Sequence, residues 1–250
     1  MAKCIKWFEI LDSTNYEANR QMDHVDDFTV FAARYQTNGR GQKGNKWESA
    51  VGENLTFSIL VKPKFIKAED QFLISQITTL GIVKYLRNRG ITASIKWPND
   101  IYVNNRKICG ILIEHYLGGD KLSASIIGIG LNLNQKRFAS DAPNPTSVIN
   151  ETGTCLVIEK ELELLLSSIE ELYHDTDVDH YVGLAKKIEK DYLSHLYHIN
   201  EYHLYEDTAT NERFEAKING IDKYACLVLE RRDGGVKSYT FKEVRYILNL

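Results

Sequence analysis

The chain has 250 residues, of which 43% are hydrophobic and 26% charged, and its formal net charge is −3. This length allows one large domain, or a large and a small one, with a substantial buried core. Without a cationic excess, nucleic acid is disfavoured as the main partner, because such binding displaces counterions from phosphates. No apolar run approaches the ~18 residues of a membrane span, and the N-terminus lacks a secretory apolar segment. We therefore expect a cytoplasmic protein with no membrane partner.

The cysteines are scattered along the chain, with no Cys-x-x-Cys pair and no histidines clustered near them; they are Cys4, Cys109, Cys155 and Cys226. This pattern predicts reduced thiols that serve mostly in packing. It indicates neither a disulfide framework nor a cysteine-based zinc site.

A strand is expected over residues 5–11, followed directly by Asp12-Ser13-Thr14-Asn15. Thr14 and Glu17 fit a capping box, which predicts a helix from there to about Met22. Ser13, Thr14 and Asn15 then lie at a strand-to-helix corner, a place where ligands often bind. Plain helix capping is the alternative interpretation of these three residues.

A second strand, over residues 28–35, leads into a glycine-rich segment at 36–47 with three glycines and three cations: Gly39, Gly41, Gly44, Arg40, Lys43 and Lys46. Glycines let backbone N–H groups approach a ligand, and the cations suit a phosphate or carboxylate. The segment predicts a site for an anionic small molecule; the alternative is a solvated hairpin. It also matches the dinucleotide-binding fingerprint, but a strand at 55–61 follows instead of a helix, which disfavours that fold.

Apolar residues at helical spacing predict a helix over 68–88, ending near Gly90. Residues 95–114 then read as strands on either side of a hairpin at 104–106, with Trp97-Pro98-Asn99-Asp100 as a break and Lys107 at the start of the return strand. A solvated hairpin lysine is the alternative interpretation of Lys107.

A further hairpin at Gly118-Gly119-Asp120 leads into a strand over 122–133. Its Gly128 and Gly130 indicate close approach of the backbone to another group, and Asn132 either points its amide there or forms a turn.

A loop over 138–150 precedes two helices, over 156–174 and 179–195, whose charged faces we expect to be solvated. Beyond 197, strand-like pieces at 214–218, 225–230 and 238–240 are separated by turn signals at Asn219-Gly220 and Asp233-Gly234-Gly235. These pieces predict a small all-β module.

Together, the segments at 13–15, 39–47, 96–100, 106–114 and 128–132 closely resemble biotin protein ligases in order and spacing. The resemblance implies an α+β fold: a catalytic domain over 1–196 with a mixed sheet and helices, related to class II aminoacyl-tRNA synthetases and lipoate ligases, then an SH3-like β-barrel over 197–250. It also implies that biotin and ATP give biotinyl-5′-AMP. A lysine of a carboxylase's biotin carboxyl carrier domain would then receive the biotinyl group.

The resemblance further implies roles for individual residues. Lys107 and Arg40 would be catalytic, Lys107 at the biotin carboxylate and forming phosphodiester, and Arg40 in the loop over the adenylate. The biotin-binding set would be Ser13, Thr14, Asn15, Gln36, Arg40, Gly41, Gln42 and Lys107. Trp47, Asn99 and Asn132 would bind the nucleotide, and Asp100 would help to place Mg²⁺.

Gln42 and Asn45 depart from the family pattern, which often has arginine in this loop, and lysine is not an equivalent fork donor. Retention of the adenylate is therefore an open question. The catalytic pattern begins close to Met1, so we expect no DNA-binding repressor domain. A lipoate ligase and a catalytically silent module that holds biotin or a carrier remain alternatives. The identity of the carrier, and whether the chain is a monomer or a homodimer, also stay open.

Overall fold

The computed structural model describes residues 4–42, 45–64, 66–139, 144–174 and 181–247. A seven-stranded sheet has the order β1-β2-β3-β7-β6-β5-β4. Its strands are β1 (Ile5–Leu11), β2 (Thr29–Gln36), β3 (Leu55–Val61), β4 (Ser94–Lys96), β5 (Asp100–Val103), β6 (Arg106–Gly118) and β7 (Lys121–Leu131). β1 and β2 are parallel and the other neighbours antiparallel, which confirms the predicted mixed sheet.

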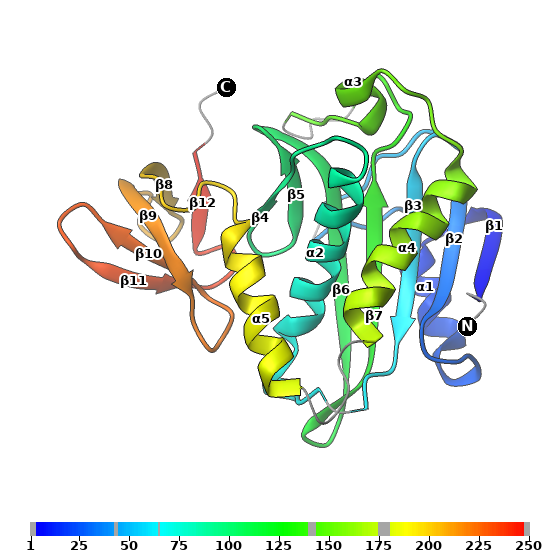
Figure 1. Cartoon of the computed structure of the whole chain (residues 1–250), viewed down its shortest axis with the longest axis horizontal. Helices are drawn as coiled ribbons and strands as arrows, with labels where there is room; N and C mark the ends of the chain where they lie inside the picture. Colours follow the sequence, from blue (N-terminus) through cyan, green and yellow to red (C-terminus); the bar gives the residue numbers. More distant parts are fainter. Residues whose placement is uncertain (1–3, 43–44, 65, 140–143, 175–180, 248–250) are drawn as a thin grey trace.

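Helices cover both faces of this sheet (Figure 1). α1 (Thr14–Gln21) packs on one face against β2, β3 and β7, while α2 (Phe72–Arg87) and α4 (Ile158–His174) cover the other. α5 (Tyr181–Ser194) packs against α2, and the short elements are η1 (Met22–His24), η2 (Ala68–Asp70) and α3 (Val148–Thr152).

The alternation of β7 separates two cores. Ile127 and Ile129 belong to the large cluster beneath α2 and α4, whereas Ala124 and Ile126 belong to a small cluster beneath α1. Since side chains alternate along a strand, positions 128 and 130 face the α1 side. Both positions are glycines, so no side chain projects from β7 toward α1 there.

The C-terminal part forms a second, antiparallel sheet in the order β11-β10-β9-β8-β12. Its strands are β8 (His203–Asp207), β9 (Arg213–Ile221), β10 (Leu227–Arg231), β11 (Val236–Tyr239) and β12 (Val244–Tyr246). Tyr205, Phe214 and Tyr239 form an aromatic core between these strands. The expected all-β module is therefore present, while the boundary at 196/197 remains a prediction.

The second sheet touches the first near the Trp-Pro-Asn-Asp segment. The Trp97 indole Nε1 donates a hydrogen bond of 3.1 Å to the carbonyl oxygen of Ala225. The ring of Phe241 lies 6.2 Å from that of Trp97 in an edge contact. The break predicted around Pro98 is thus a junction between the two sheets.

One turn prediction was wrong. Asn219-Gly220 lies inside β9 at a shift of register opposite β10, where Gly220 has φ +146° and accommodates the bulge. The chain reverses instead after Ile221, where the Asp222 carboxylate accepts hydrogen bonds from the backbone N–H groups of Tyr224 and Cys226. β8 and β12 had no counterpart in the sequence prediction.

The expectation of a wholly solvated charged face on the helix after residue 156 was also wrong. Glu161 on α4 is buried, with 3% of its surface exposed. Its carboxylate accepts hydrogen bonds from the Tyr85 hydroxyl at 2.6 Å and from Arg89 Nε at 2.8 Å. A buried carboxylate requires such partners, and here they tie α4 to α2 and to the segment that follows it.

Parts of the sequence predictions lie outside the described residues: Lys43 and Gly44 of the glycine-rich segment, residues 140–143 of the predicted loop, and the first two residues of the 179–195 helix. Among the described residues no helix is both long and apolar enough to cross a membrane. All four cysteines are free, as predicted, but the prediction that they serve mostly in packing was wrong, because Cys4 and Cys155 are exposed and Cys226 is half-buried. Cys109 is buried, and burial raises the pKa of its thiol.

Candidate active site

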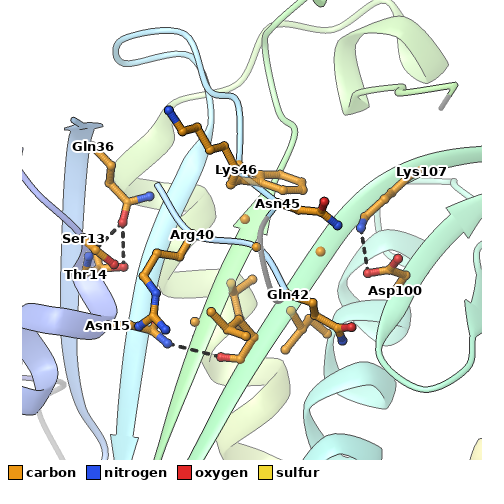
Figure 2. Close-up of a pocket in the computed structure, with 18 of the residues that line it drawn as sticks. Ser13, Thr14, Asn15, Gln36, Arg40, Gln42, Asn45, Lys46, Asp100 and Lys107 are labelled. Atoms are coloured by element: carbon orange, nitrogen blue, oxygen red, sulfur yellow. Dashed lines mark hydrogen bonds and ion pairs between the residues drawn. The ribbon is translucent and has the colours of Figure 1, made fainter. Parts of the chain in front are cut away.

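A cavity of about 220 Å³ opens on the α1 side of the large sheet. It is lined by the N-terminus of α1, the end of β2, the glycine-rich segment, and parts of β5, β6 and β7. Figure 2 shows Lys107 and Asp100 at one side of this pocket and Ser13, Thr14 and Gln36 at the other. The pocket therefore gathers most of the site residues predicted from sequence.

Glycines on β6 and β7 make room for the pocket. A Cβ added to Gly128 would lie 2.1 Å from Asn15 Oδ1, and one added to Gly130 would lie 2.3 Å from Trp47 Cε2. A Cβ at Gly110, which pairs with Gly130 across the strands, would lie 2.8 Å from Trp47 Cζ3. The close approach predicted at Gly128 and Gly130 is confirmed, and the groups involved are Asn15 and the Trp47 indole.

The predicted capping box is replaced by a long-range contact. Ser13 is the N-cap residue but makes no capping hydrogen bond with its side chain. Gln36 Oε1, at the end of β2, instead accepts hydrogen bonds from the Thr14 N–H at 2.8 Å and the Thr14 hydroxyl at 3.2 Å. Gln36 thus satisfies a free N–H of the first helical turn and joins the two segments at the pocket wall.

A chain of hydrogen bonds fixes the buried side chain of Asn15. Ser58 Oγ donates to Asn15 Oδ1 at 2.6 Å, and Asn15 Nδ2 donates to Glu114 Oε2 at 2.8 Å. The Arg40 guanidinium pairs with Glu114 at 3.0 Å and lies over the Tyr16 ring. Arg40, although predicted to contact the ligand, is therefore held by a carboxylate in this structure.

Sequence reasoning gave no role to Ser58 or Glu114. A signal for Ser58 was available: Thr56 and Ser58 alternate with apolar residues in the strand at 55–61, so both fall on the pocket face. Glu114 lies in the 106–114 segment, but nothing local links it to Arg40, 74 positions away. Phe241 reaches the pocket from the second sheet, and no sequence signal pointed to it.

One side of the pocket carries the ion pair of Lys107 and Asp100. Lys107 Nζ lies 2.8 Å from Asp100 Oδ1, with 26% and 29% of the two side chains exposed. Lys107 Nζ is also 5.8 Å from the centre of the Trp47 ring. A partly exposed ion pair contributes only ~0–1 kcal/mol to stability.

The neighbouring Lys96, from the same Lys-Trp-Pro-Asn-Asp motif, is largely buried. Its Nζ donates to the Tyr102 hydroxyl at 3.2 Å, and burial lowers its pKa. The charges of Asp100 and Lys107 both act on Lys96, so this partly buried ammonium group lies near the Lys107–Asp100 pair.

Two residues predicted to bind the nucleotide lie behind the pocket lining. Asn99 accepts a hydrogen bond from Gln42 Nε2 at 2.9 Å and donates to the Ile111 carbonyl at 2.8 Å, so both of its groups are engaged. Asn132 donates to the Thr146 carbonyl at 2.9 Å.

Two buried polar atoms beside the pocket are unpaired. Asn132 Oδ1 and Trp47 Nε1 have no hydrogen-bond partner among the residues that the structure describes. Leaving a buried donor or acceptor unsatisfied costs ~1–3 kcal/mol. One acceptor and one donor, both on residues predicted to bind the nucleotide, thus lack partners among the described residues.

The family model "Biotin/lipoate A/B protein ligase family" matches residues 7–132. Among curated proteins, the bifunctional ligase/repressor BirA of Bacillus subtilis is 28% identical over 255 residues, covering 96% of this chain and 73% of its own length. A biotin–[acetyl-CoA-carboxylase] ligase of Paracoccus denitrificans is 31% identical over 160 residues, covering 62% of this chain and 66% of its own.

Among solved structures, a biotin protein ligase from Aquifex aeolicus in complex with biotin and ATP matches with a TM-score of 0.78 at 25% identity. The match covers 99% of this chain and 100% of that one. The matched family segment includes the strands that line the pocket, β2, β5, β6 and β7, together with α1 and the glycine-rich segment. The chain therefore belongs to the biotin/lipoate A/B protein ligase family.

Proposed function

We propose that this protein is an ATP-dependent biotin protein ligase that forms biotinyl-5′-AMP and transfers the biotinyl group to a lysine of a carrier domain. One observation carries the proposal. A single pocket combines a neutral wall rich in donors and acceptors, a glycine floor and, at the opposite side, the Lys107–Asp100 pair. The polar wall suits a cyclic urea, and the Lys107–Asp100 pair suits a carboxylate that approaches a triphosphate.

Biotin would lie with its ureido ring toward Ser13, Thr14, Asn15 and Gln36. A urea has two N–H donors and a carbonyl acceptor, so it needs both kinds of partner in a confined space. Asn15 is held from both sides by Ser58 and Glu114, which keeps its amide fixed before the ligand arrives. The carboxylate of biotin then points toward Lys107.

In the first step a carboxylate oxygen attacks the α-phosphorus of ATP, a new P–O bond forms, and the bond to the β-phosphate breaks to release pyrophosphate. Two anions must approach each other, so catalysis rests on positioning and on neutralising charge. Lys107 supplies a fixed positive charge for the carboxylate and the forming phosphodiester. Arg40, oriented by Glu114, adds positive charge from the loop side.

Trp47 and Asn132 would hold the adenine. The indole lies against Gly110 and Gly130, and the free Asn132 Oδ1 accepts an amino-group hydrogen. Asp100 fits a Mg²⁺ role, because it is the acidic residue among the described pocket-lining residues and Mg²⁺ typically binds one or two carboxylates together with substrate phosphates. The ion would neutralise charge on the pyrophosphate group.

In the second step the amine of a carrier lysine attacks the adenylate carbonyl, an amide forms, the amine loses a proton, and AMP leaves. A biotin carboxyl carrier domain of a carboxylase is the proposed partner. The need for ATP and for such a carboxylase supports a cytoplasmic location.

A lipoate ligase is the second candidate, since the matched family includes both activities. The polar wall argues for biotin, because the dithiolane ring of lipoate offers no N–H or carbonyl to the four polar side chains there. Exchange of labelled pyrophosphate into ATP, with biotin, lipoate or no acid, distinguishes the candidates. Exchange with biotin alone is expected; exchange with lipoate alone, or with neither in folded protein, contradicts the proposal.

A further inference from the structure

A second cavity, of about 560 Å³, lies next to the catalytic pocket, between the N-terminal end of α2, β6 and two turns of the second sheet. Three side chains, Gln42, Leu112 and Phe241, line both cavities, so they form the wall between them. The adenylate is proposed to form on one side of this wall. The cavity on the other side has no role in that step.

The lining of the second cavity is largely apolar. Phe72, Pro98 and Ile113 supply apolar surface beyond the shared wall. Among the described residues no carboxylate lines the cavity, and the exposed Lys242 is the one cation there. Burial lowers the pKa of the lining His115 imidazole to about 4, so that group is uncharged at neutral pH. The cavity therefore suits an apolar chain with a neutral end better than it suits an ion.

The transfer step needs an uncharged lysine amine at the carbonyl of the adenylate. A lysine in water has a pKa of about 10.4 and is almost wholly protonated at neutral pH, and a protonated amine has no lone pair with which to attack. Removal from water and a nearby positive charge both lower the pKa of an ammonium group. Apolar walls without a carboxylate, and Lys242 at the rim, provide both effects.

We propose that the second cavity is the entry passage for the acceptor lysine of the carrier domain, an inference that rests on the proposed ligase function. The lysine stem would lie on the apolar lining, and its amine would pass between Gln42, Leu112 and Phe241 to the adenylate. The ammonium gives up one proton to water as it enters. Its nitrogen then bonds to the biotinyl carbonyl carbon, the bond from that carbon to the phosphate oxygen breaks, AMP leaves with the electron pair, and the second proton passes to water.

Phe241 is the wall residue best placed to open this passage. It lies on the connection between β11 and β12, and 45% of its surface is exposed. Leu112, by contrast, is part of β6, and Gln42 is held by its hydrogen bond of 2.9 Å to Asn99. Exposed side chains change rotamer rapidly, so the passage opens from the side of the second sheet.

The surface beside the cavity indicates the charge of the carrier face that would cover it. The turn after β9 carries Lys223, the connection after β11 carries Lys242, and both lysines are exposed. Neither forms an ion pair in the described part of the chain. The neighbouring acids Asp222 and Glu243 accept hydrogen bonds from backbone N–H groups. Two unpaired cations favour a carrier with acidic residues around its acceptor lysine.

Pyrophosphate exchange reports the first step alone, and carrier biotinylation reports both steps, so comparing the two rates isolates the transfer. Gln71 is exposed at the start of α2 and lines the second cavity but not the catalytic pocket. Gln71→Trp narrows the passage and should leave exchange unchanged, while kcat/KM for the carrier falls roughly tenfold. Gln71→Ala is the matched control and should leave both rates unchanged.

Lys242→Glu tests the chemistry of the passage, because a carboxylate at the rim stabilises the ammonium form of the entering lysine. Transfer should slow and its pH profile should move to higher pH, while exchange stays normal; Lys160→Glu, which changes an exposed lysine on α4, should alter neither. Normal transfer in both Gln71→Trp and Lys242→Glu, or an equal loss of exchange and transfer, overturns the entry passage. Absence of exchange in the wild type refutes the ligase assignment itself, and the passage with it.

Discussion

Gly128→Ala is predicted to damage both stability and biotin binding through Asn15. The new Cβ would lie 2.1 Å from Asn15 Oδ1 and 2.9 Å from its Cγ, far inside van der Waals contact. Asn15 cannot turn away without breaking its bonds to Ser58 at 2.6 Å and to Glu114 at 2.8 Å. Making room for the new methyl group therefore requires Asn15 to break its hydrogen bonds.

The size of the effect follows from those bonds. A neutral hydrogen bond contributes about 1 kcal/mol and one to a carboxylate about 2 kcal/mol, and a strained rotamer adds up to ~1 kcal/mol. We expect the free energy of unfolding to fall by about 3 kcal/mol. Biotin affinity should fall as well, because the displaced Asn15 amide leaves the position proposed for the ureido ring.

Urea unfolding and calorimetric titration with biotin measure the two effects. Gly183→Ala is the matched control, because Gly183 is an exposed residue of α5 whose added Cβ would meet nothing within 4 Å, and it should be neutral or stabilising by up to ~1 kcal/mol. In a double-mutant cycle, Gly128→Ala should cost little more once Asn15→Ala has removed the clash. Wild-type stability and biotin affinity in Gly128→Ala would refute the reasoning.

Charged and buried groups elsewhere give three further predictions. Lys107→Ala should slow pyrophosphate exchange roughly 100-fold, as expected for loss of a charge that stabilises the transition state. Arg106→Ala is the control, because the Arg106 side chain pairs with Glu151, and this variant should exchange at the normal rate. Equal rates in the two variants would contradict the role of Lys107. Burial lowers the pKa of His115 from 6.5 to about 4. As the pH falls through that window, the unfolded chain takes up this proton before the folded protein does, so the free energy of unfolding decreases. His115→Asn should therefore reduce the difference between the urea midpoints measured at neutral pH and at about pH 5, and an unchanged difference would contradict this. Glu161→Ala leaves the buried Tyr85 hydroxyl and the partly exposed Arg89 guanidinium without their partner. It should lower the free energy of unfolding, measured by urea unfolding, by about 3 kcal/mol; a loss below ~1 kcal/mol would mean that the carboxylate is not required there.

Local sequence patterns predicted the secondary structure well where each element's own residues determine it. The strands at 5–11 and 55–61 have the predicted bounds, and the hairpin before Lys107 is where Asn104 and Asn105 indicated it. Gly128 and Gly130 marked the pocket floor because glycine inside an apolar strand typically permits another group to approach the backbone closely. In each of these cases the determining signal lies within a few residues.

The sequence predictions that were wrong share a different cause. Gln36 replaced the predicted capping box from 22 positions away, and Glu161 is buried because Tyr85 and Arg89 meet it across two helices. Gly220 was predicted to lie in a turn but instead accommodates a bulge in β9, where its register with β10 shifts. Such contacts depend on tertiary packing, which no short window of sequence contains.

The most direct test of the proposed activity is the intact mass of a biotin carboxyl carrier domain after incubation with this protein, biotin and ATP. We predict the addition of one biotinyl group, dependent on ATP and absent when the acceptor lysine of the carrier is replaced by arginine. The Lys107→Ala variant should give the same product far more slowly. An unmodified carrier despite pyrophosphate exchange, or a lipoyl group when lipoate is supplied in competition, would contradict the assignment as a biotin protein ligase.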